Sequence, residues 1–274
     1  MGQGHHKIGI ITGGGQFPIL LATELRSKGF SVIAVAHNGE TDPALTQFTD
    51  KSIWIDLGQL DQLINYLKQN HVDKAIMAGT VNKRRMFDNQ TPDNTAKNLI
   101  SELPIFHDDG ILKALADLLK SEGIEIISAT GFLPELTAPS GYLTKRHLNQ
   151  EEEQDVEFGW KMAKEIGRLD IGQCVVVRKK TVLAVEAIEG TDDTIHRGGL
   201  LAKEGAVVVK VCKPDQDLRF DMPSVGPQTI RVMSSVKAGV LAVEAGKTLI
   251  FDSGQMVGLA NKAGISIIAL DKGD

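Results

Sequence analysis

Cysteine is scarce in this sequence, which has only Cys174 and Cys212 among its 274 residues. The two form neither a CxxC pair nor another metal-ligand spacing, and each lies in a valine-rich run. We therefore expect both to pack as small hydrophobic residues in a reducing compartment. Apolar runs near the ~20 residues that span a bilayer are also absent, as is a cleavable N-terminal signal pattern. These absences predict a cytoplasmic protein without a membrane-crossing segment.

Positive charge is not in excess either. Thirty Lys and Arg residues stand against thirty-five Asp and Glu residues, a formal net charge of −5 at pH 7. This balance argues against a dedicated nucleic-acid binder, so an anionic ligand has to be held by a local basic cluster. With 42% hydrophobic and 24% charged residues the chain is globular, and its length suits two domains of roughly 150 residues each.

Strands and helices alternate through the N-terminal half. Short β-branched runs predict strands buried on both faces, and amphipathic stretches with apolar residues three to four apart separate them. The predicted strands cover 7–11, 30–36, 52–57, 74–78 and 124–129, and the predicted helices lie around 17–25, 60–67 and 112–119. Such alternation builds a parallel sheet with right-handed crossovers. We predict a Rossmann-like domain with flanking helices over residues 1–138.

A change of composition at Pro134, Pro139 and Gly141 separates the second half, residues 139–274. Its acidic run opens a helix, where it complements the helix dipole, and two β-branched runs predict a hairpin. The predicted elements are a helix over 151–166, hairpin strands at 173–177 and 181–187, a strand at 206–211, a helix over 228–245, a strand at 248–251, a helix after 252 and a strand at 265–270. We predict a mixed-sheet α/β domain.

A glycine turn, Gly13-Gly14-Gly15, follows the first strand and precedes a helix. Backbone N–H groups of such a turn can bind an anion at the helix N-terminus. Pro18 occupies the third-glycine position of the dinucleotide fingerprint, and the second strand ends at 36–38 without the acid that binds a ribose. Phosphate or nucleotide contact, a purely structural turn and a nicotinamide site all stay open here.

Two further segments lie where ligands or helix caps are expected. Gly79 and Thr80 leave the end of a parallel strand and lead into the basic run 83–85. Open α/β sheets bind ligands at strand carboxyl ends, so this segment is either a phosphate or sugar contact or a solvated basic loop. In residues 186–199, Thr191 or Asp192 can cap a helix and Arg197 points back over the same end. Capping alone and a phosphate or metal role both stay open.

The densest cluster of charges lies in residues 210–223, between a buried strand and Pro223. Two prolines exclude a regular helix or central strand, so the segment is a shaped loop. Its charged and amide side chains are Lys210, Lys213, Asp215, Gln216, Asp217, Arg219 and Asp221. Carboxylates at this spacing can hold Mg²⁺ while lysine and arginine neutralise phosphoryl charge. A salt-bridged surface loop is the alternative.

These motifs together resemble a known family. Residues 190–199, 208–223 and 226–230 look like the signature of the UDP-2,3-diacylglucosamine pyrophosphatases of the LpxI type, and residues 13–18 are similar to that family's N-terminal turn. The resemblance covers essentially the whole chain. One departure is that the family's Gly-x-Val-x-Arg-Pro run reads Gly79-Thr80-Val81-Asn82-Lys83-Arg84-Arg85 here, without the proline.

The resemblance implies two α/β domains with the active site between them and hydrolysis of UDP-2,3-diacylglucosamine to UMP and 2,3-diacylglucosamine 1-phosphate (lipid X) in lipid A biosynthesis. It also implies Mg²⁺ dependence and an essential Asp221. The expected partner is the diacylated UDP-sugar rather than nucleic acid, met in transient contact with the inner membrane surface; a homodimer is left open. An NAD- or nucleotide-sugar-dependent Rossmann enzyme and a non-catalytic nucleotide-binding module are the alternatives.

Within this hypothesis the candidate residues fall into three groups. Asp221 and Asp217 are expected to hold the metal. The expected catalytic residues are Asp221, Asp217, Arg219, Lys210 and Lys213, and the expected substrate-binding residues are Gly13, Gly14, Gly15, Gly79, Thr80, Asp192, Arg197, Gln216 and Thr229.

Overall fold

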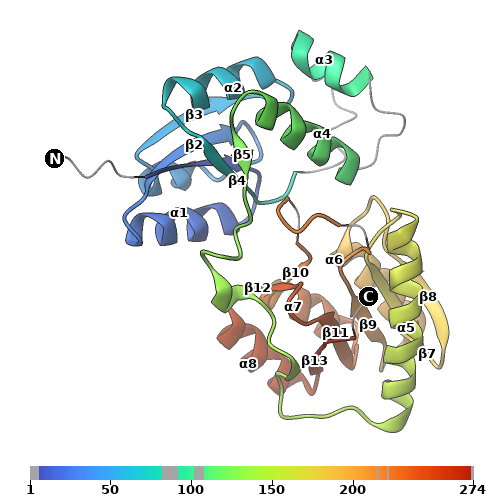
Figure 1. Ribbon diagram of the computed structural model, residues 1–274. Helices are drawn as coiled ribbons and strands as arrows, with labels where there is room; N and C mark the ends of the chain where they lie inside the picture. The colour runs from blue at the N-terminus through green and yellow to red at the C-terminus, as the bar shows by residue number, and fades with distance from the viewer. Residues whose placement is uncertain (1–5, 82–91, 102–107, 215, 221, 273–274) are drawn as a thin grey trace. The chain divides into compact units, whose positions relative to one another are not determined.

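The computed structural model describes residues 6–81, 92–101, 108–214, 216–220 and 222–272 (Figure 1). Contacts divide the chain into two units. The first comprises residues 1–134 together with the short segment 217–221, and the second comprises residues 135–216 and 222–274. The segment 217–221 therefore belongs to the first unit although the sequence on both sides of it belongs to the second.

The first unit is built on a parallel sheet of five strands in the order β3-β2-β1-β4-β5. Its elements are β1 (Lys7–Thr12), α1 (Phe17–Ser27), β2 (Ser31–His37), the 3₁₀ helix η1 (Pro43–Phe48), β3 (Lys51–Ile55), α2 (Leu60–Gln69), β4 (Lys74–Ala78), α3 (Asn94–Ser101), α4 (Asp108–Ser121) and β5 (Glu125–Ile126). The predicted Rossmann-like parallel sheet is confirmed. β5 is shorter than the predicted strand at 124–129.

Apolar side chains on one face of this sheet pack with α2 and α4, which supply Leu67 and Leu119 to the cluster. Helix α1 lies against β1 and β2 and buries Leu21 and Leu25. Helices on the sheet leave the central strands buried, which explains why β1 and β2 read as nearly continuous apolar runs.

The second unit has a mixed sheet of six strands in the order β6-β13-β11-β9-β7-β8. Its elements are η3 (Pro134–Leu136, at the boundary), β6 (Gly141–Tyr142), α5 (Gln150–Arg168), β7 (Cys174–Arg178), β8 (Thr181–Val185), α6 (Thr191–Ala202), β9 (Val207–Lys210), β10 (Ser224–Val225), α7 (Pro227–Ser235), β11 (Val240–Glu244), β12 (Leu249–Ile250), α8 (Ser253–Ala263) and β13 (Ser266–Leu270). Strands β9, β11 and β13 run parallel, whereas β6, β7 and β8 make antiparallel pairs. The predicted mixed sheet and the β7–β8 hairpin are confirmed.

Two helical layers enclose this second sheet (Figure 1). Helix α5 packs Val156 and Trp160 on one face, together with valines of β7 and β9. Helices α6, α7 and α8 pack on the other face through Ile195, Met233 and Met256. Both cysteines are buried and neither forms a disulfide, and burial raises the pKa of the Cys174 thiol, as expected for small packing residues.

The helix predicted over residues 228–245 is wrong. Helix α7 ends at Ser235, Lys237 adopts a positive φ of 53°, and β11 follows as a fully buried central strand. The run Val240-Leu241-Ala242-Val243 is uniformly apolar, so its periodicity cannot distinguish a buried strand from a helix. Its pairing with β9 and β13 decides the outcome.

The helices that the structure describes include none whose length and hydropathy would let it cross a membrane.

Candidate functional site

The glycine turn of the first unit is tied to the end of β4 by backbone hydrogen bonds. The amide of Gly13 donates to Ala78 O at 2.8 Å, the amide of Gly14 donates to Thr80 O at 2.6 Å, and the amide of Thr80 donates back to Gly14 O at 3.1 Å. A Cβ on Gly13 would lie 2.3 Å from Thr80 O, and one on Gly79 would lie 2.5 Å from Gly14 O. Close approach of two loops therefore explains glycine at positions 13 and 79.

This pairing reduces the number of backbone N–H groups with which the turn can bind a ligand. Two of its amides already donate to protein carbonyls, so the structural-turn alternative accounts for Gly13 and Gly14. Gly15 differs, because it has a φ of +85° and open space around the position of a Cβ. It lines a cavity instead.

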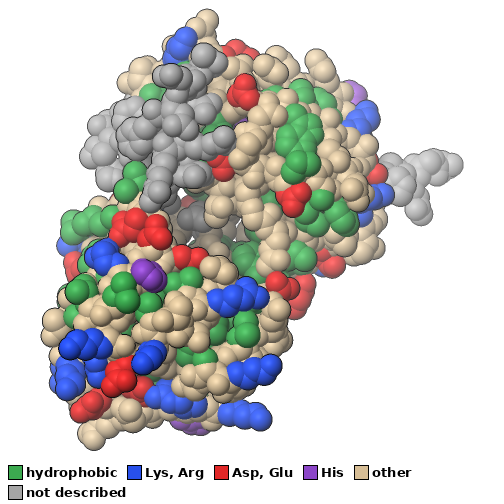
Figure 2. Space-filling view, turned by 180° about the vertical axis from the view of Figure 1, so that it is seen from behind, with side chains coloured by type: hydrophobic (Ala, Val, Ile, Leu, Met, Phe, Trp, Pro, Cys, Tyr) green, Lys and Arg blue, Asp and Glu red, His purple; other side chains and the backbone are tan. Residues whose placement is uncertain are grey.

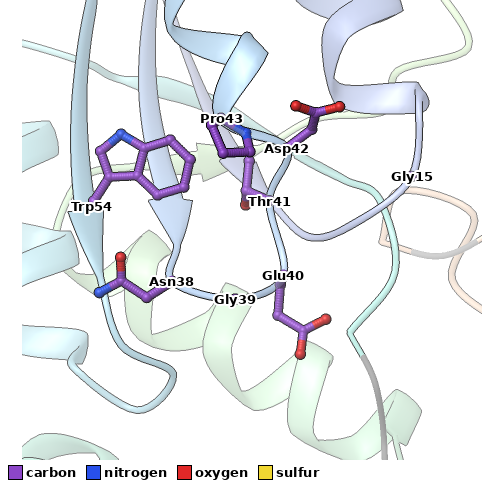
Figure 3. A pocket seen from close by; sticks show the side chains of 8 residues that line it. All are labelled: Gly15, Asn38, Gly39, Glu40, Thr41, Asp42, Pro43 and Trp54. Atoms are coloured by element: carbon purple, nitrogen blue, oxygen red, sulfur yellow. The ribbon is translucent and has the colours of Figure 1, made fainter.

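That cavity lies in the first unit at the carboxyl ends of β1, β2 and β3 (Figure 3). Its volume is about 790 Å³, and its lining residues are Gly15, Asn38, Gly39, Glu40, Thr41, Asp42, Pro43 and Trp54. Ligands of open α/β sheets bind at this end of the strands. Apart from Gly15, none of the lining residues belongs to the predicted site.

The segment 217–221 carries a tight ion pair. The guanidinium of Arg219 donates from Nε to Asp217 Oδ1 at 2.9 Å and from Nη2 to Asp217 Oδ2 at 2.5 Å. This hydrogen bonding is the main cause that lowers the pKa of Asp217, so the carboxylate is ionised at neutral pH. The same guanidinium lies 4.8 Å from the centroid of the Phe220 ring, and Phe220 is buried within the apolar cluster of the first unit. Phe220 thus anchors the segment, and Asp221 lies outside the described residues, as do Asp215 and the run 82–91.

Lys210 forms the centre of a polar cluster in the second unit. It ends β9, is only 7% exposed and donates from Nζ to Ser224 O at 2.8 Å. Its ammonium interacts electrostatically with Asp192 in the first turn of α6, whose carboxylate accepts a hydrogen bond from Gln228 in the first turn of α7. The Asp192–Gln228 hydrogen bond links the starts of α6 and α7, and the buried ammonium interacts with the first of them.

This place holds charges of both signs, because the Asp192 carboxylate interacts with the Lys210 ammonium and with the carboxylates of Asp193 and Glu186. Helix N-termini carry partial positive charge and present backbone N–H groups, and Lys210 adds a full charge. Burial of the Asp192 carboxyl raises its pKa, and the Lys210 ammonium opposes that rise. Thr229 stands in the same helix start, where its hydroxyl accepts from the amide of Gly226 at 3.3 Å.

The other predicted residues of the second unit are held elsewhere within it. Lys213 pairs with Asp170 at 2.5 Å, and Gln216 accepts from the amide of Lys213 at 3.1 Å. Arg197 does point back over the start of α6, as predicted, and donates to Glu189 at 2.6 Å and to Val185 O at 2.9 Å. The structure therefore brings Asp192, Lys210 and Thr229 to the same two helix starts and gives Lys213, Gln216 and Arg197 other partners.

Sequence reasoning missed Gln228 and Ser224, which complete the surroundings of Lys210. Gln228 follows the proline at the first position of α7. Because Gly-Pro is typical of a helix start, the sequence could have placed this polar side chain in the first turn of a helix. Ser224 accepts the Lys210 hydrogen bond with its backbone carbonyl oxygen, and a motif of side chains cannot predict a backbone acceptor.

The carboxylates expected to hold Mg²⁺ are only partly among the described residues, because Asp217 is described and Asp221 is not. Within the described ranges, no group of three or more His, Cys, Asp or Glu side chains is placed to hold a metal ion, and both oxygens of Asp217 accept from Arg219. Mg²⁺ commonly uses only one or two carboxylates together with water and substrate phosphates. The described residues alone do not make up such a site, and the Mg²⁺ requirement stays a prediction.

A Rossmann-like unit and a mixed-sheet unit with a buried lysine define a two-domain α/β protein. Comparison with protein families agrees, because the LpxI N-terminal domain matches residues 7–136 and the LpxI C-terminal domain matches residues 139–268. The chain belongs to the LpxI family.

A curated relative gives the same assignment. The UDP-2,3-diacylglucosamine pyrophosphatase LpxI of Caulobacter vibrioides is 32% identical over 277 residues, which cover 97% of this chain and 98% of the relative. Among solved structures, the biotin carboxylase subunit of a pyruvate carboxylase has 11% identity and a TM-score of 0.27, covering 68% of this chain and 38% of its own. N5-carboxyaminoimidazole ribonucleotide synthetase from Thermotoga maritima has 18% identity and a TM-score of 0.26, and the match covers 66% of this chain and 41% of the synthetase chain. The family assignment does not depend on these two.

Proposed function

We propose that this chain hydrolyses the pyrophosphate bond of UDP-2,3-diacylglucosamine to UMP and 2,3-diacylglucosamine 1-phosphate, a step of lipid A biosynthesis. The observation that carries the proposal is the buried Lys210, which donates to Ser224 O and interacts with Asp192 at the start of α6, in the part of the chain that matches the LpxI C-terminal domain. The relative named for this activity spans nearly the whole chain.

The reaction explains why such a cluster is needed. A water oxygen forms a bond to one phosphorus, the bridging P–O bond breaks, and negative charge accumulates on the non-bridging oxygens and on the leaving phosphate. Fixed positive groups that meet this charge stabilise the transition state more than the ground state. The ammonium of Lys210 has three N–H donors, of which Ser224 O takes one, and the two helix starts add backbone N–H groups.

Asp221 is proposed as the essential carboxylate, and Mg²⁺ as the cation that it holds with Asp217 during the reaction. The support is the donor chemistry, since carboxylate oxygens are the ligands that Mg²⁺ takes in phosphoryl transfer. When bound, the ion would neutralise phosphate charge. Asp217 is ionised already, because the Arg219 hydrogen bonds lower its pKa.

We also propose that the chain meets its lipid substrate by transient contact with the inner membrane surface. Three large aliphatic side chains, Leu169, Ile171 and Ile188, are 55%, 47% and 53% exposed. They lie in two neighbouring loops of the second unit, since Gly172 packs directly against the backbone of Glu186. Figure 2 shows Lys and Arg side chains spread over one face of this unit, with fewer Asp and Glu side chains among them, and anionic headgroups attract such positive charge.

The function is tested with the purified full chain and UDP-2,3-diacylglucosamine in detergent, with UMP measured over time. Release of UMP that stops in excess EDTA and returns with added Mg²⁺ is the expected result. Absence of UMP release under all metal conditions would contradict the proposed function, and full activity in EDTA would contradict the metal alone.

A further inference from the structure

The cavity of the first unit is a preformed site that the hydrolytic cluster does not use. About 790 Å³ lies within the 300–1,000 Å³ range of small-molecule sites. Its lining comes from three successive strand ends: Gly15 after β1, residues 38–43 after β2 and Trp54 in β3.

Hydrogen bonds fix the loop that forms most of the lining. The hydroxyl of Thr41 lies 2.8 Å from Thr12 O and accepts from the amide of His37 at 3.0 Å, and Asp42 accepts from the amide of Ala44 at 2.9 Å. Nδ1 of the buried His37 lies 2.8 Å from Thr12 O. A ligand would therefore meet a loop that is already ordered, which limits the entropy lost on binding.

The charges of the lining exclude a phosphate and suit a neutral polar ligand. Glu40 and Asp42 contribute carboxylates, and the lining contains no Lys or Arg. Carboxylates repel a phosphoryl group but accept hydrogen bonds from hydroxyl groups, which is how an acidic residue after the second strand holds a ribose in Rossmann folds. The second strand lacks that acid at its end, yet Glu40 follows shortly afterwards in the loop.

Trp54 supplies a stacking surface beside these carboxylates. It belongs to the edge strand β3 and is half-buried, and Figure 3 shows its indole pointing from β3 toward Pro43. Aromatic side chains that line a groove stack with nucleobases, each of which has a π face.

We propose that this cavity binds the nucleoside half of the substrate, with the uracil ring on Trp54 and the ribose hydroxyls donating to Glu40. The inference rests on the proposed function for the identity of the nucleoside. The pyrophosphate lies outside the cavity, because the lining has two carboxylates and neither Lys nor Arg to neutralise it.

The first experiment is a calorimetric titration of the full chain with uridine. Trp54→Ala should weaken uridine binding roughly tenfold or more, the scale of one base–aromatic stack, whereas Trp54→Phe should retain most of the affinity. Inorganic pyrophosphate should not compete with uridine. Equal uridine affinity of wild type and Trp54→Ala, no uridine binding by the wild type at millimolar concentration, or competition by pyrophosphate would each overturn the inference.

The second experiment tests the ribose contact. Wild type should bind uridine more tightly than 2′,3′-dideoxyuridine, and Glu40→Gln should reduce that difference, with Glu24→Gln on α1 as the matched control. An unchanged difference in Glu40→Gln, with circular dichroism showing a folded chain, would overturn the assignment of Glu40.

Turnover separates this inference from the proposed function. If UDP-2,3-diacylglucosamine is hydrolysed, Trp54→Ala should raise KM and leave kcat within about threefold, since uniform binding is lost. Hydrolysis with an unchanged KM in Trp54→Ala would overturn the nucleoside site and leave the proposed function standing. Uridine binding that depends on Trp54 in a chain that releases no UMP would support the cavity and reject the proposed function.

Discussion

Replacing Lys210 by methionine removes the ammonium and keeps an unbranched side chain of similar length. The side chain is 7% exposed, and its Nζ donates to Ser224 O at 2.8 Å. A hydrogen bond with one charged partner is worth about 1.5–3 kcal/mol. We expect Lys210→Met to lower the free energy of unfolding of the second unit by roughly that amount, seen as a reduced midpoint in urea denaturation.

The pH dependence of that loss follows from Asp192. Burial raises the pKa of this carboxyl, and the Lys210 ammonium opposes the rise, so Lys210→Met should raise the pKa of Asp192 further. A carboxyl whose pKa is higher in the folded state destabilises that state fully above the folded pKa, and the penalty disappears as the pH falls through the folded pKa to below the unfolded pKa. The deficit of Lys210→Met should therefore be smaller at low pH than at neutral pH, because only the hydrogen bond to Ser224 O is then missing. Asp192→Asn should restore part of the loss at neutral pH.

Activity provides the decisive measurement on the same variant. Removing one preorganised group that faces transition-state charge costs about 10²–10³-fold in kcat, so UMP release by Lys210→Met should fall in that range. Lys161→Met, on the exposed surface of α5, is the matched control and should retain wild-type kcat. A folded Lys210→Met with less than about tenfold loss in kcat would show that Lys210 only anchors the Ser224 backbone.

Three further predictions address other parts of the chain. Asp221→Ala should lower turnover by roughly 100-fold or more while substrate binding survives, measured as UMP release and equilibrium binding; a loss below about tenfold would move the chemistry to another carboxylate. Gly13→Ala should destabilise the first unit by about 1–3 kcal/mol, because its Cβ would lie 2.3 Å from Thr80 O. Gly110→Ala, which meets nothing within 4 Å, is its control, and equal melting curves would refute the close-approach argument. Asp217→Asn should cost up to about 1 kcal/mol, the scale of exposed ion pairs; because the wild-type pKa is lowered below its usual 3.8, that cost should be present near neutral pH and vanish as the pH falls well below this value. If the urea midpoints of wild type and Asp217→Asn differed by the same amount at every pH, the predicted loss of the ion pair's contribution at low pH would be contradicted.

The sequence by itself determined the elements whose signals are local. Strand β4 (Lys74–Ala78) coincides with its prediction, and the β7–β8 hairpin was readable because two β-branched runs flank a short polar link. The alternation of strands and helices was sufficient to predict a parallel sheet, because the right-handedness of strand–helix–strand connections leaves few other topologies. Family membership was also readable, because the signature lies in contiguous segments of the chain.

Tertiary structure decided the features that join distant segments. The apolar run 240–243 became a central strand only because β9 and β13 pair with it. Two amides of the glycine turn donate to the carbonyls of residues 78 and 80. No motif within the turn itself predicts these distant partners. The surroundings of Lys210 come from β9, α6 and α7, and the segment 217–221 joined the first unit through the burial of Phe220. Local propensity acts within a few residues, whereas burial and hydrogen-bond partners are assigned only when the whole chain packs.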